Sequence, residues 1–302
     1  MLYLSIAICS NALMFLLLKH YDRYGRSRRA VLLVNYITAS LIAAFLCWKN
    51  SIFDQIGSLK PAGGLQYLLG NFQGNLSTQG SIFWALILGT IAGVFCFAAL
   101  ALIQNRIGKE DAGIVSMFTK LGILVPVILS IFIWSEVPSR LQWIGIVLAV
   151  VSIVVANIEP ANVKKLNVRA LLLLFFVGGI ADFLGKVFQK YALMEYRSLY
   201  LFLLYSVAAL CCFFWYLCNS CAAIDMPTVS YGIILGAANI CANGLVIRAL
   251  IHMPACVVYP AYSAGVILVV ALASTIVFQE RLERNEFVAI VTTIASLILL
   301  NL

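Results

Sequence analysis

Long apolar runs separated by short polar segments make up most of this chain. A membrane-spanning helix needs about 20 mostly apolar residues, and the runs are close to that length. The pattern predicts ten spanning helices, at about residues 2–19, 30–48, 81–104, 112–134, 141–158, 168–190, 198–218, 230–250, 255–278 and 286–302. Continuous runs favour an all-α, multi-pass membrane protein, because a membrane barrel shows short strands of alternating polarity instead.

The composition also indicates a membrane protein, and the positive net charge is to be interpreted in that setting. Hydrophobic residues make up 63% of the chain and charged residues only 11%, whereas soluble domains contain about 25% charged residues. The net charge of +8 does not indicate a nucleic-acid partner, because most Lys and Arg lie in short connections. Odd-numbered connections carry more of them, which places these connections in the cytoplasm and both termini outside. We expect a bacterial plasma (inner) membrane.

The nine cysteines do not predict a metal site or a disulfide framework. Most lie inside apolar runs, where cysteine behaves as a small hydrophobic residue. Cys218 and Cys221 have CxxC spacing, but no second pair and no nearby histidine accompany them. We therefore expect neither a metal nor a cofactor.

Two parts of the chain match each other. When residues 112–158 are laid on 256–302 with a shift of 144 and no gap, several polar residues coincide. They are Ser130 with Ser274, Glu136 with Glu280, Arg140 with Arg284, Ser152 with Ser296, and Asn157 with Asn301. The first and sixth runs also align, with Asn11 at the position of Asp182 and Lys19 at that of Lys190.

The repeat predicts two five-helix domains, residues 1–160 and 161–302. Because five is odd, the second half must enter the membrane upside down. Inverted repeats are typical of alternating-access transporters, whose binding site lies near the midplane between the halves. Small residues in the helices are expected to allow close packing; they include Gly89, Gly93, Gly145, Gly232 and Gly236.

Two signatures give the chain a family resemblance. KLGILVPVILSIFIWSE runs into QWIGIVLAVVSIVVAN, and YSAGVILVVALASTIVFQE runs into EFVAIVTTIASLILLN. With the ten runs and the repeat, they resemble the drug/metabolite transporter superfamily in its ten-helix EamA-type form. The resemblance implies transport of small metabolites, drugs or organic cations. Glu136 and Glu280 fit the family pattern at helix ends, where we interpret them as caps or gate contacts.

Ionisable residues inside spans are costly and are therefore candidates for function. Asp182 and Lys186 lie one helical turn apart, share a face and can pair. Their helix is expected to turn this polar face into a central cavity; packing of Asp182 against a neighbouring helix and snorkelling of Lys186 are the alternatives. Lys120, with Ser116 one turn before it, is the strongest single candidate. Pro126 is expected to kink that helix, where Lys120 could instead bind backbone carbonyls.

Polar and aromatic residues supply further candidates for substrate binding. Tyr259, Tyr262 and Ser263 group on one face around Pro260, which can open the helix there. The alternative is tyrosines packed in the core. Because the helices at 112–134 and 255–278 are repeat partners, we expect Lys120 to face this cluster.

The remaining candidates are amides. Asn239 and Asn243, at i and i+4, can bind a substrate or hold helices together. Asn11 is a candidate because it matches Asp182 in the repeat. Arg248 lies near a helix end, as either a membrane anchor or a ligand contact.

These residues favour a secondary transporter for a small polar metabolite. No Walker motif is present, and buried lysines outnumber the single deep acid, so a carboxylate- or phosphate-bearing substrate such as an amino acid is expected. Asp182 could exchange a coupling proton. The alternative is a carrier of organic cations or choline-like compounds, or a drug exporter, in which tyrosines form a cation–π cage.

The sequence argues against an enzyme, because His20 and His252 lie far apart and no DxD or HxxxH pattern occurs. The partners are a small-molecule substrate and the lipid bilayer, and a monomer and a homodimer both remain open.

Overall fold

The computed structural model describes residues 2–22, 28–57, 77–106, 112–157, 167–218, 224–278 and 284–302, which are helical with short connections and contain no strand. The helices are α1 (Leu2–Asp22), α2 (Arg28–Lys49), α3 (Ile52–Gly57), α5 (Thr78–Arg106), α6 (Ala112–Leu121), α7 (Leu124–Trp134), α8 (Arg140–Asn157), α9 (Val168–Tyr191), α10 (Arg197–Cys218), α11 (Met226–Ala249), α12 (Ala255–Phe278) and α13 (Arg284–Leu300), with a 3₁₀ turn at Met194–Tyr196.

Helices lie at each of the ten segments predicted from the sequence, with ends shifted by a few residues. Eight helical segments in the described ranges are long and apolar enough to cross a membrane, with α6 and α7 together forming one of them. The other two segments, α8 and α13, are apolar but shorter. The chain is therefore an all-helical, multi-pass integral membrane protein.

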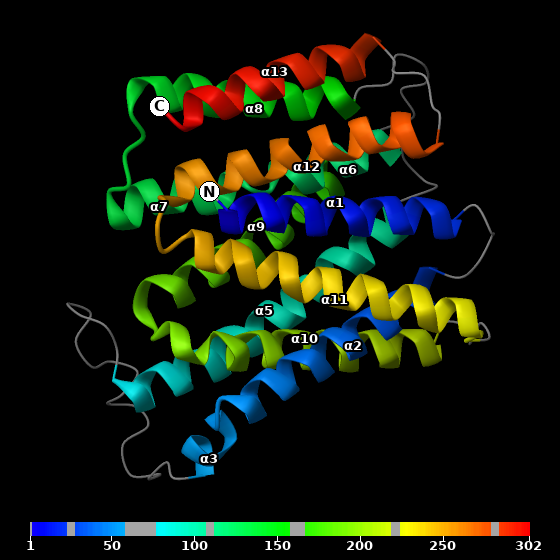
Figure 1. Ribbon diagram of the computed structural model, residues 1–302, viewed down its shortest axis with the longest axis vertical. Helices are drawn as coiled ribbons and strands as arrows, with labels where there is room; N and C mark the ends of the chain where they lie inside the picture. Colours follow the sequence, from blue (N-terminus) through cyan, green and yellow to red (C-terminus); the bar gives the residue numbers. More distant parts are fainter. Residues whose placement is uncertain are drawn as a thin grey trace.

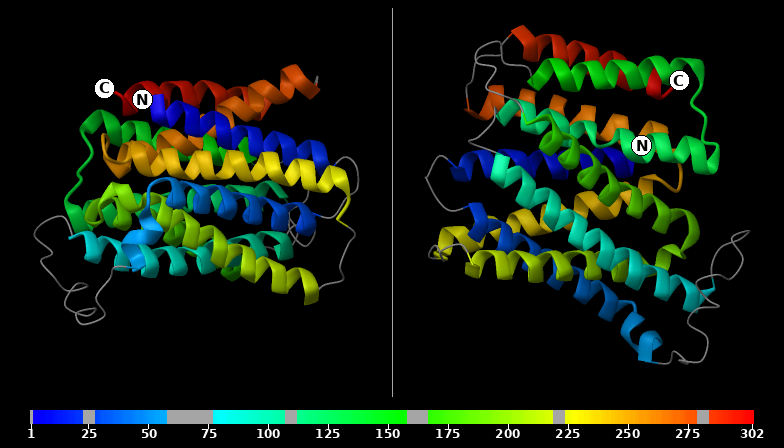
Figure 2. Two further views of the ribbon diagram at one scale, coloured as in Figure 1. Left: turned by 60° about the horizontal axis from the view of Figure 1, so that its bottom comes forward. Right: turned by 180° about the vertical axis from the view of Figure 1, so that it is seen from behind.

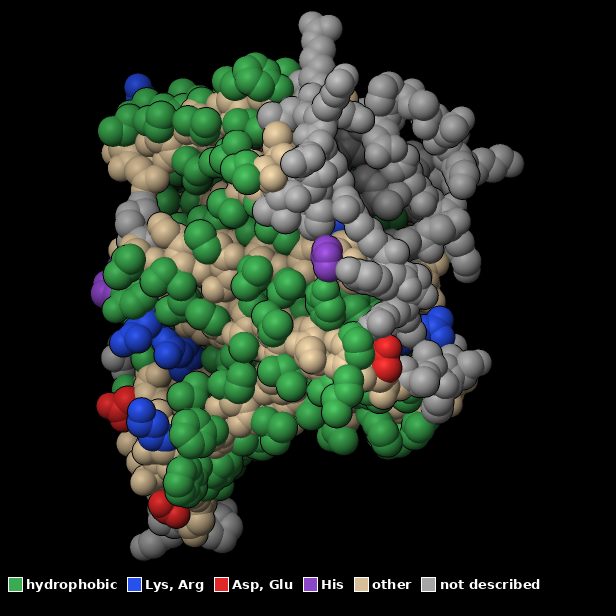
Figure 3. All heavy atoms as spheres, turned by 45° about the vertical axis from the view of Figure 1, so that its right-hand side comes forward, with side chains coloured by type: hydrophobic (Ala, Val, Ile, Leu, Met, Phe, Trp, Pro, Cys, Tyr) green, Lys and Arg blue, Asp and Glu red, His purple; other side chains and the backbone are tan. Residues whose placement is uncertain are grey.

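The surface is apolar to a degree that only lipid can cover. Among large hydrophobic side chains, Phe132 is 81% exposed and Ile276 is 78% exposed. Figure 3 shows hydrophobic side chains across much of the described surface on one face, with charged side chains near its margins. Such continuous apolar exposure is typical of a membrane interaction surface.

The helices lie side by side with their axes roughly aligned, and both chain termini lie at the same end of the bundle (Figure 1). The pair α8 and α13 forms one edge and packs on α12. At the opposite edge, α10 packs on α2 and α5 (Figure 2). Between these edges, α1 contacts α11 and α12, and α9 contacts α5, α6 and α7.

Glycines bring helix backbones close together at two similar crossings. On α5, a Cβ added to Gly93 would lie 2.6 Å from the carbonyl oxygen of Leu204 on α10. On α11, a Cβ added to Gly236 would lie 2.6 Å from the carbonyl oxygen of Asn35 on α2. In each case a second glycine one turn earlier, Gly89 or Gly232, is also in close contact. The close packing predicted from these small residues is confirmed.

The helix predicted at 112–134 is broken rather than merely kinked. It ends at Leu121, and α7 begins at Leu124. Pro126 explains the position, because a proline ring clashes with the carbonyl of the residue four before it, here Gly122. By contrast, α12 continues through Pro260 from Ala255 to Phe278, so the opening predicted there is wrong for this conformation.

The break lets α6 and α7 approach α9 closely. A Cβ added to Gly179 of α9 would lie 2.4 Å from the carbonyl oxygen of Gly122 and 2.6 Å from the Cβ of Val125. Neither a backbone oxygen nor a β-branched Cβ can move aside easily. This crossing holds the irregular segment against α9.

We expect Gly179→Ala to lower thermal stability in detergent, because overpacking of a tight contact costs about 1–3 kcal/mol. The adjacent Gly178→Ala is the matched control, since nothing lies within 4 Å of a Cβ at that position. Thermal unfolding of the two purified variants measures the difference. Equal melting temperatures would contradict the close crossing of α9 with the helix break.

Candidate functional site

Polar side chains from several helices meet inside the apolar bundle. The Nδ2 of Asn11 on α1 donates a hydrogen bond to the hydroxyl of Tyr262 on α12. One turn before Tyr262, the hydroxyl of Tyr259 donates to the backbone carbonyl of Asp182 on α9 at 2.8 Å. Ser263 is buried beside them on α12. The structure thus brings together candidates that come from three separate runs of the sequence.

Asp182 faces the inside of the bundle. Its side chain is exposed, yet it interacts electrostatically with Tyr200 of α10 and with Tyr259 and Tyr262 of α12. Tyr200 and Tyr259 are only 1% and 3% exposed. The carboxylate is therefore accessible, whereas Tyr200 and Tyr259 beside it are buried. Within the described part of the chain, this carboxylate forms no hydrogen bond or ion pair.

Lys186 does not pair with Asp182, so the pairing predicted from their spacing is wrong. Its Nζ lies 2.8 Å from Oε1 of Glu136, in the connection between α7 and α8. Lys186 is 2% exposed, and its Nζ also lies 5.8 Å from the ring centroid of Trp134. A buried ammonium requires a counter-charge, and Glu136 supplies it from another element. In this conformation the Lys186 ammonium is therefore closed to a ligand.

Glu136 joins a third element to this ion pair. Its Oε2 accepts a hydrogen bond of 2.8 Å from the backbone N–H of Ala255, the first residue of α12. Helix N-termini leave backbone N–H groups unsatisfied, and a carboxylate there also interacts favourably with the helix dipole. The predicted capping role of Glu136 is confirmed, whereas Glu280 lies outside the described residues.

Lys120 is the second ionisable candidate near the centre. It lies half-buried at the end of α6, one turn after Ser116, and its Nζ is 5.3 Å from the ring centroid of Phe15 on α1. It forms no ion pair with any residue that the structure describes. Phe15 and Asn11 are four residues apart on α1 and therefore share a face. Lys120 and Tyr262 thus lie against the same face of α1, as the predicted opposition of Lys120 and the tyrosines requires.

Asn239 and Asn243 form a network with two residues that the sequence analysis missed. The Nδ2 of Asn243 donates to the hydroxyl of Tyr205 at 2.8 Å and to Oδ1 of Asn239 at 2.8 Å. The Nδ2 of Asn239 donates to Oδ1 of Asn35 at 3.3 Å. These bonds hold α11 against α10 and α2, which favours the helix-holding alternative for the amides.

Asn35 and Tyr205 are polar residues inside apolar runs. The same signal identified Asn239, so it could have identified these two as well. Tyr205 also interacts electrostatically with Tyr200 and Tyr262, so the amide network continues into the surroundings of Asp182. We call these connected side chains the central polar layer; it comprises Asn11, Asn35, Asp182, Tyr200, Tyr205, Asn239, Asn243, Tyr259 and Tyr262.

The comparisons with known proteins identify a fold and no activity. No protein-family model and no curated protein matches the sequence. A solved structure described only as a crystal structure of a protein superposes with a TM-score of 0.68, over 99% of this chain and 94% of that chain, at 11% identity. At this identity the similarity shows that the fold is shared. Within the described ranges, no three His, Cys, Asp or Glu side chains are grouped to hold a metal ion.

We expect Glu136→Gln to destabilise the protein strongly, because it leaves the buried Lys186 ammonium without a counter-charge. Loss of one partner from a buried pair costs about 3–5 kcal/mol. Combining it with Lys186→Met should restore much of the loss, since both charges are then absent. Equilibrium unfolding in mixed micelles measures both variants, with Lys190→Met, an exposed lysine one turn later, as the control. Additive effects in the double variant would contradict a coupled pair.

Proposed function

We propose that this chain is a secondary transporter that carries a small polar metabolite by alternating access. The observation that carries the proposal is a pair of ionisable side chains, Lys120 and Asp182, which lie inside an apolar bundle without an ion-pair partner among the described residues. Ionisable groups in membrane spans are expensive and mark pathways for substrates or ions. A bound substrate would supply the missing partners.

The proposed architecture is ten helices in two inverted five-helix halves, residues 1–160 and 161–302. The helix contacts support it in part, because exchanging the halves converts several main contacts into one another, although in the described ranges the contact of α8 with α12 has no main counterpart between α13 and α6 or α7. The contact of α2 with α11 becomes that of α10 with α5, and both crossings use a pair of glycines. Likewise the contact of α1 with α11 corresponds to that of α9 with α5. The contact of α1 with α12 corresponds to those of α9 with α6 and α7. Two such halves can exchange conformations and expose a midplane site to either side.

In this architecture one end of the site is closed by the Glu136 ion pair. The pair joins α9, the connection between α7 and α8, and the first residue of α12. This connection lies at the end of the bundle that also carries both chain termini (Figure 1). Opening toward that end would have to separate Lys186 from Glu136, so we assign the pair to a gate.

The charges at the site favour a zwitterionic substrate such as an amino acid. With Lys186 engaged by Glu136, one cation and one anion remain, Lys120 and Asp182. Lys120 precedes Gly122 by two residues, and Asp182 follows Gly179 by three, so they lie on either side of the close crossing of these glycines. In the proposed topology α6 and α7, the fourth pass, run in the same direction as α9, the sixth pass. At 1.5 Å per residue, the backbone positions of the two residues are about 7–8 Å apart along the axis, so both belong to the same level of the bundle.

The roles follow from this arrangement. Lys120 binds the substrate carboxylate, and Asp182 binds the ammonium or exchanges a coupling proton. Tyr259, Tyr262 and Asn11 surround the body of the substrate, with Ser263 behind them. Asn239 and Asn243 hold the wall of the site through Tyr205.

We expect Lys120→Ala to lower the uptake of radiolabelled amino acids into proteoliposomes strongly. A hydrogen bond to a charged group is worth about 1.5–3 kcal/mol, which corresponds to about a tenfold to hundredfold loss of affinity. Lys190→Ala, an exposed lysine at the end of α9, is the matched control and should transport normally. If Lys120→Ala transports as well as the parent, the assignment of Lys120 is wrong.

An organic-cation carrier is the second candidate, because tyrosines surround the Asp182 carboxylate as they would in a cation–π site. Thermal-shift assays distinguish the two. For the amino-acid carrier, amino acids should stabilise the parent, and both Lys120→Ala and Asp182→Asn should lose the effect. Stabilisation by quaternary amines that survives Lys120→Ala but not Asp182→Asn would replace our proposal by the cation carrier.

A further inference from the structure

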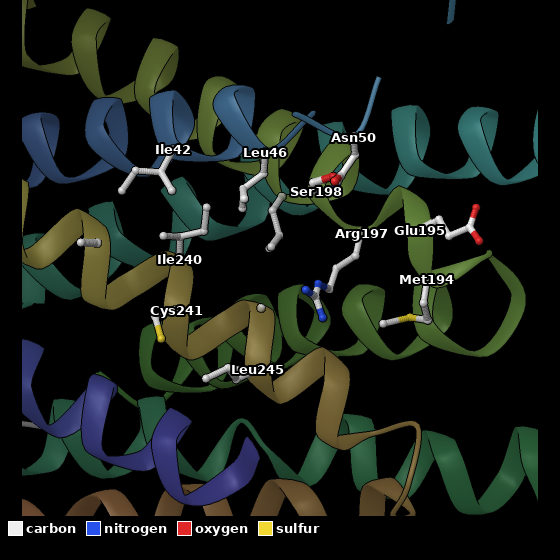
Figure 4. Close-up of a pocket in the computed structure, with 13 residues that line it drawn as sticks. Ile42, Leu46, Asn50, Met194, Glu195, Arg197, Ser198, Ile240, Cys241 and Leu245 are labelled. Carbon is white, nitrogen blue, oxygen red and sulfur yellow. The ribbon is translucent and has the colours of Figure 1, made fainter. Parts of the chain in front are cut away.

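A second recess lies apart from the central polar layer, among α2, α10 and α11 (Figure 4). Its volume is about 480 Å³, and no side chain of the central polar layer lines it. That volume is within the range of ligand pockets, about 300–1,000 Å³. Apolar side chains form its walls; they include Ile42, Leu46, Leu201, Ala237, Ile240 and Leu245. We call this recess the lateral groove.

The mouth of the lateral groove carries a cation with no counter-charge. Arg197 is the first residue of α10, and its guanidinium points into the groove (Figure 4). Among the residues that the structure describes, it forms no ion pair, and its electrostatic neighbours are Arg248 and Tyr3. Arg248 in turn packs over the ring of Tyr3, with its Cζ 5.0 Å from the centroid. A guanidinium that forms no ion pair at the mouth of an apolar groove is suited to bind an anion such as a phosphate.

An acid borders the same mouth on the other side. Glu195 lines the groove, and its carboxylate points away from the Arg197 guanidinium (Figure 4). Glu195 is exposed and pairs with no basic group in the described ranges. With Asn50 it also lines an adjoining recess of about 320 Å³, whose other walls are Ile52, Gln55 and Tyr196. The mouth therefore offers a cationic and an anionic contact next to a small recess with both polar and apolar walls.

The position of the mouth matches the headgroup level of a bilayer. Arg197 begins its helix, Arg248 lies in the last turn of α11, and Asn50 directly follows α2. From Asn50 the wall continues along α2 through Leu46 and Ile42, one turn apiece, which at 1.5 Å per residue gives a depth of about 12 Å. Polar contacts thus lie at the helix ends, and the apolar walls extend toward the midplane.

We propose that the lateral groove binds a glycerophospholipid whose headgroup carries a primary amine, as in phosphatidylethanolamine. Arg197, supported by Arg248, binds the phosphate, Glu195 binds the ammonium, and one acyl chain lies along the apolar walls. A soluble anion would leave those walls empty, and a lipid without an amine would leave Glu195 unpaired. This binding site is separate from the transport site and does not depend on the proposed substrate.

Native mass spectrometry of the full chain in detergent tests the proposal, with phosphatidylethanolamine, phosphatidylcholine and phosphatidylglycerol of matched acyl chains as probes. The parent should retain phosphatidylethanolamine at least tenfold more strongly than the other two. Arg197→Ala should lower retention of phosphatidylethanolamine by a similar factor, and Glu195→Gln should remove its advantage over phosphatidylcholine. Ala237→Phe, which fills the groove from an exposed wall position, should lower retention of all three lipids.

Arg140→Ala is the matched control, because Arg140 is an exposed arginine that begins α8, away from the groove. It should leave lipid retention unchanged, and the melting temperature of each variant verifies its folding. Equal retention of the three lipids by the parent, or unchanged retention in Arg197→Ala, would overturn the proposal. So would Arg197-dependent stabilisation by inorganic phosphate alone, which would identify a soluble anion as the ligand. The lipid assay contains no transport substrate. Its outcome therefore does not depend on the uptake assay, and a failure of one can be told apart from a failure of the other.

Discussion

Lipid offers no hydrogen-bond partner, so a polar group inside this protein depends on partners within the chain or on a ligand. The Lys186–Glu136 pair shows the consequence most clearly. A buried ammonium and a carboxylate lie 2.8 Å apart, and the same carboxylate satisfies the first N–H of α12. Desolvation makes each charge costly alone, so the three elements that supply these groups are held in one arrangement. The packing of α9, α12 and the connection after α7 depends on this contact.

The same constraint separates the groups that hold the bundle together from those that remain for function. Asn239, Asn243 and Tyr205 satisfy one another, so their network stabilises the contact among α2, α10 and α11. Lys120 and Asp182 differ from them, because neither forms an ion pair with any residue that the structure describes. At the helix ends, Arg197 and Glu195 are similarly unpaired, but they border lipid-facing walls. The two sets of unpaired charges therefore point to two different ligands.

Several residues could be interpreted correctly from the sequence because their behaviour follows from local chemistry. Glu136 is an acid near a helix end and does act as a cap, although the helix that it caps is the distant α12. Gly93 and Gly236 lack a side chain, and they lie where backbones approach. The pairing of Asp182 with Lys186 failed, although the two are one turn apart, because spacing on one helix says nothing about a competing acid on another element. Pro126 and Pro260 have opposite outcomes, since the helix breaks before the first and continues through the second.

The sequence by itself determined where the long helical segments lie, since apolar length and the cost of unpaired backbone groups in lipid leave no other regular structure. It also determined which side chains are chemically unusual in that setting. Only the tertiary structure decided which of them are satisfied: Lys186 by Glu136, and Asn239 by Asn35 and Tyr205. It alone revealed the lateral groove, because the lining comes from α2, α10 and α11 together with the turn before α10. Partners that lie far apart in the chain are brought together by packing, and no local pattern records which surfaces will meet.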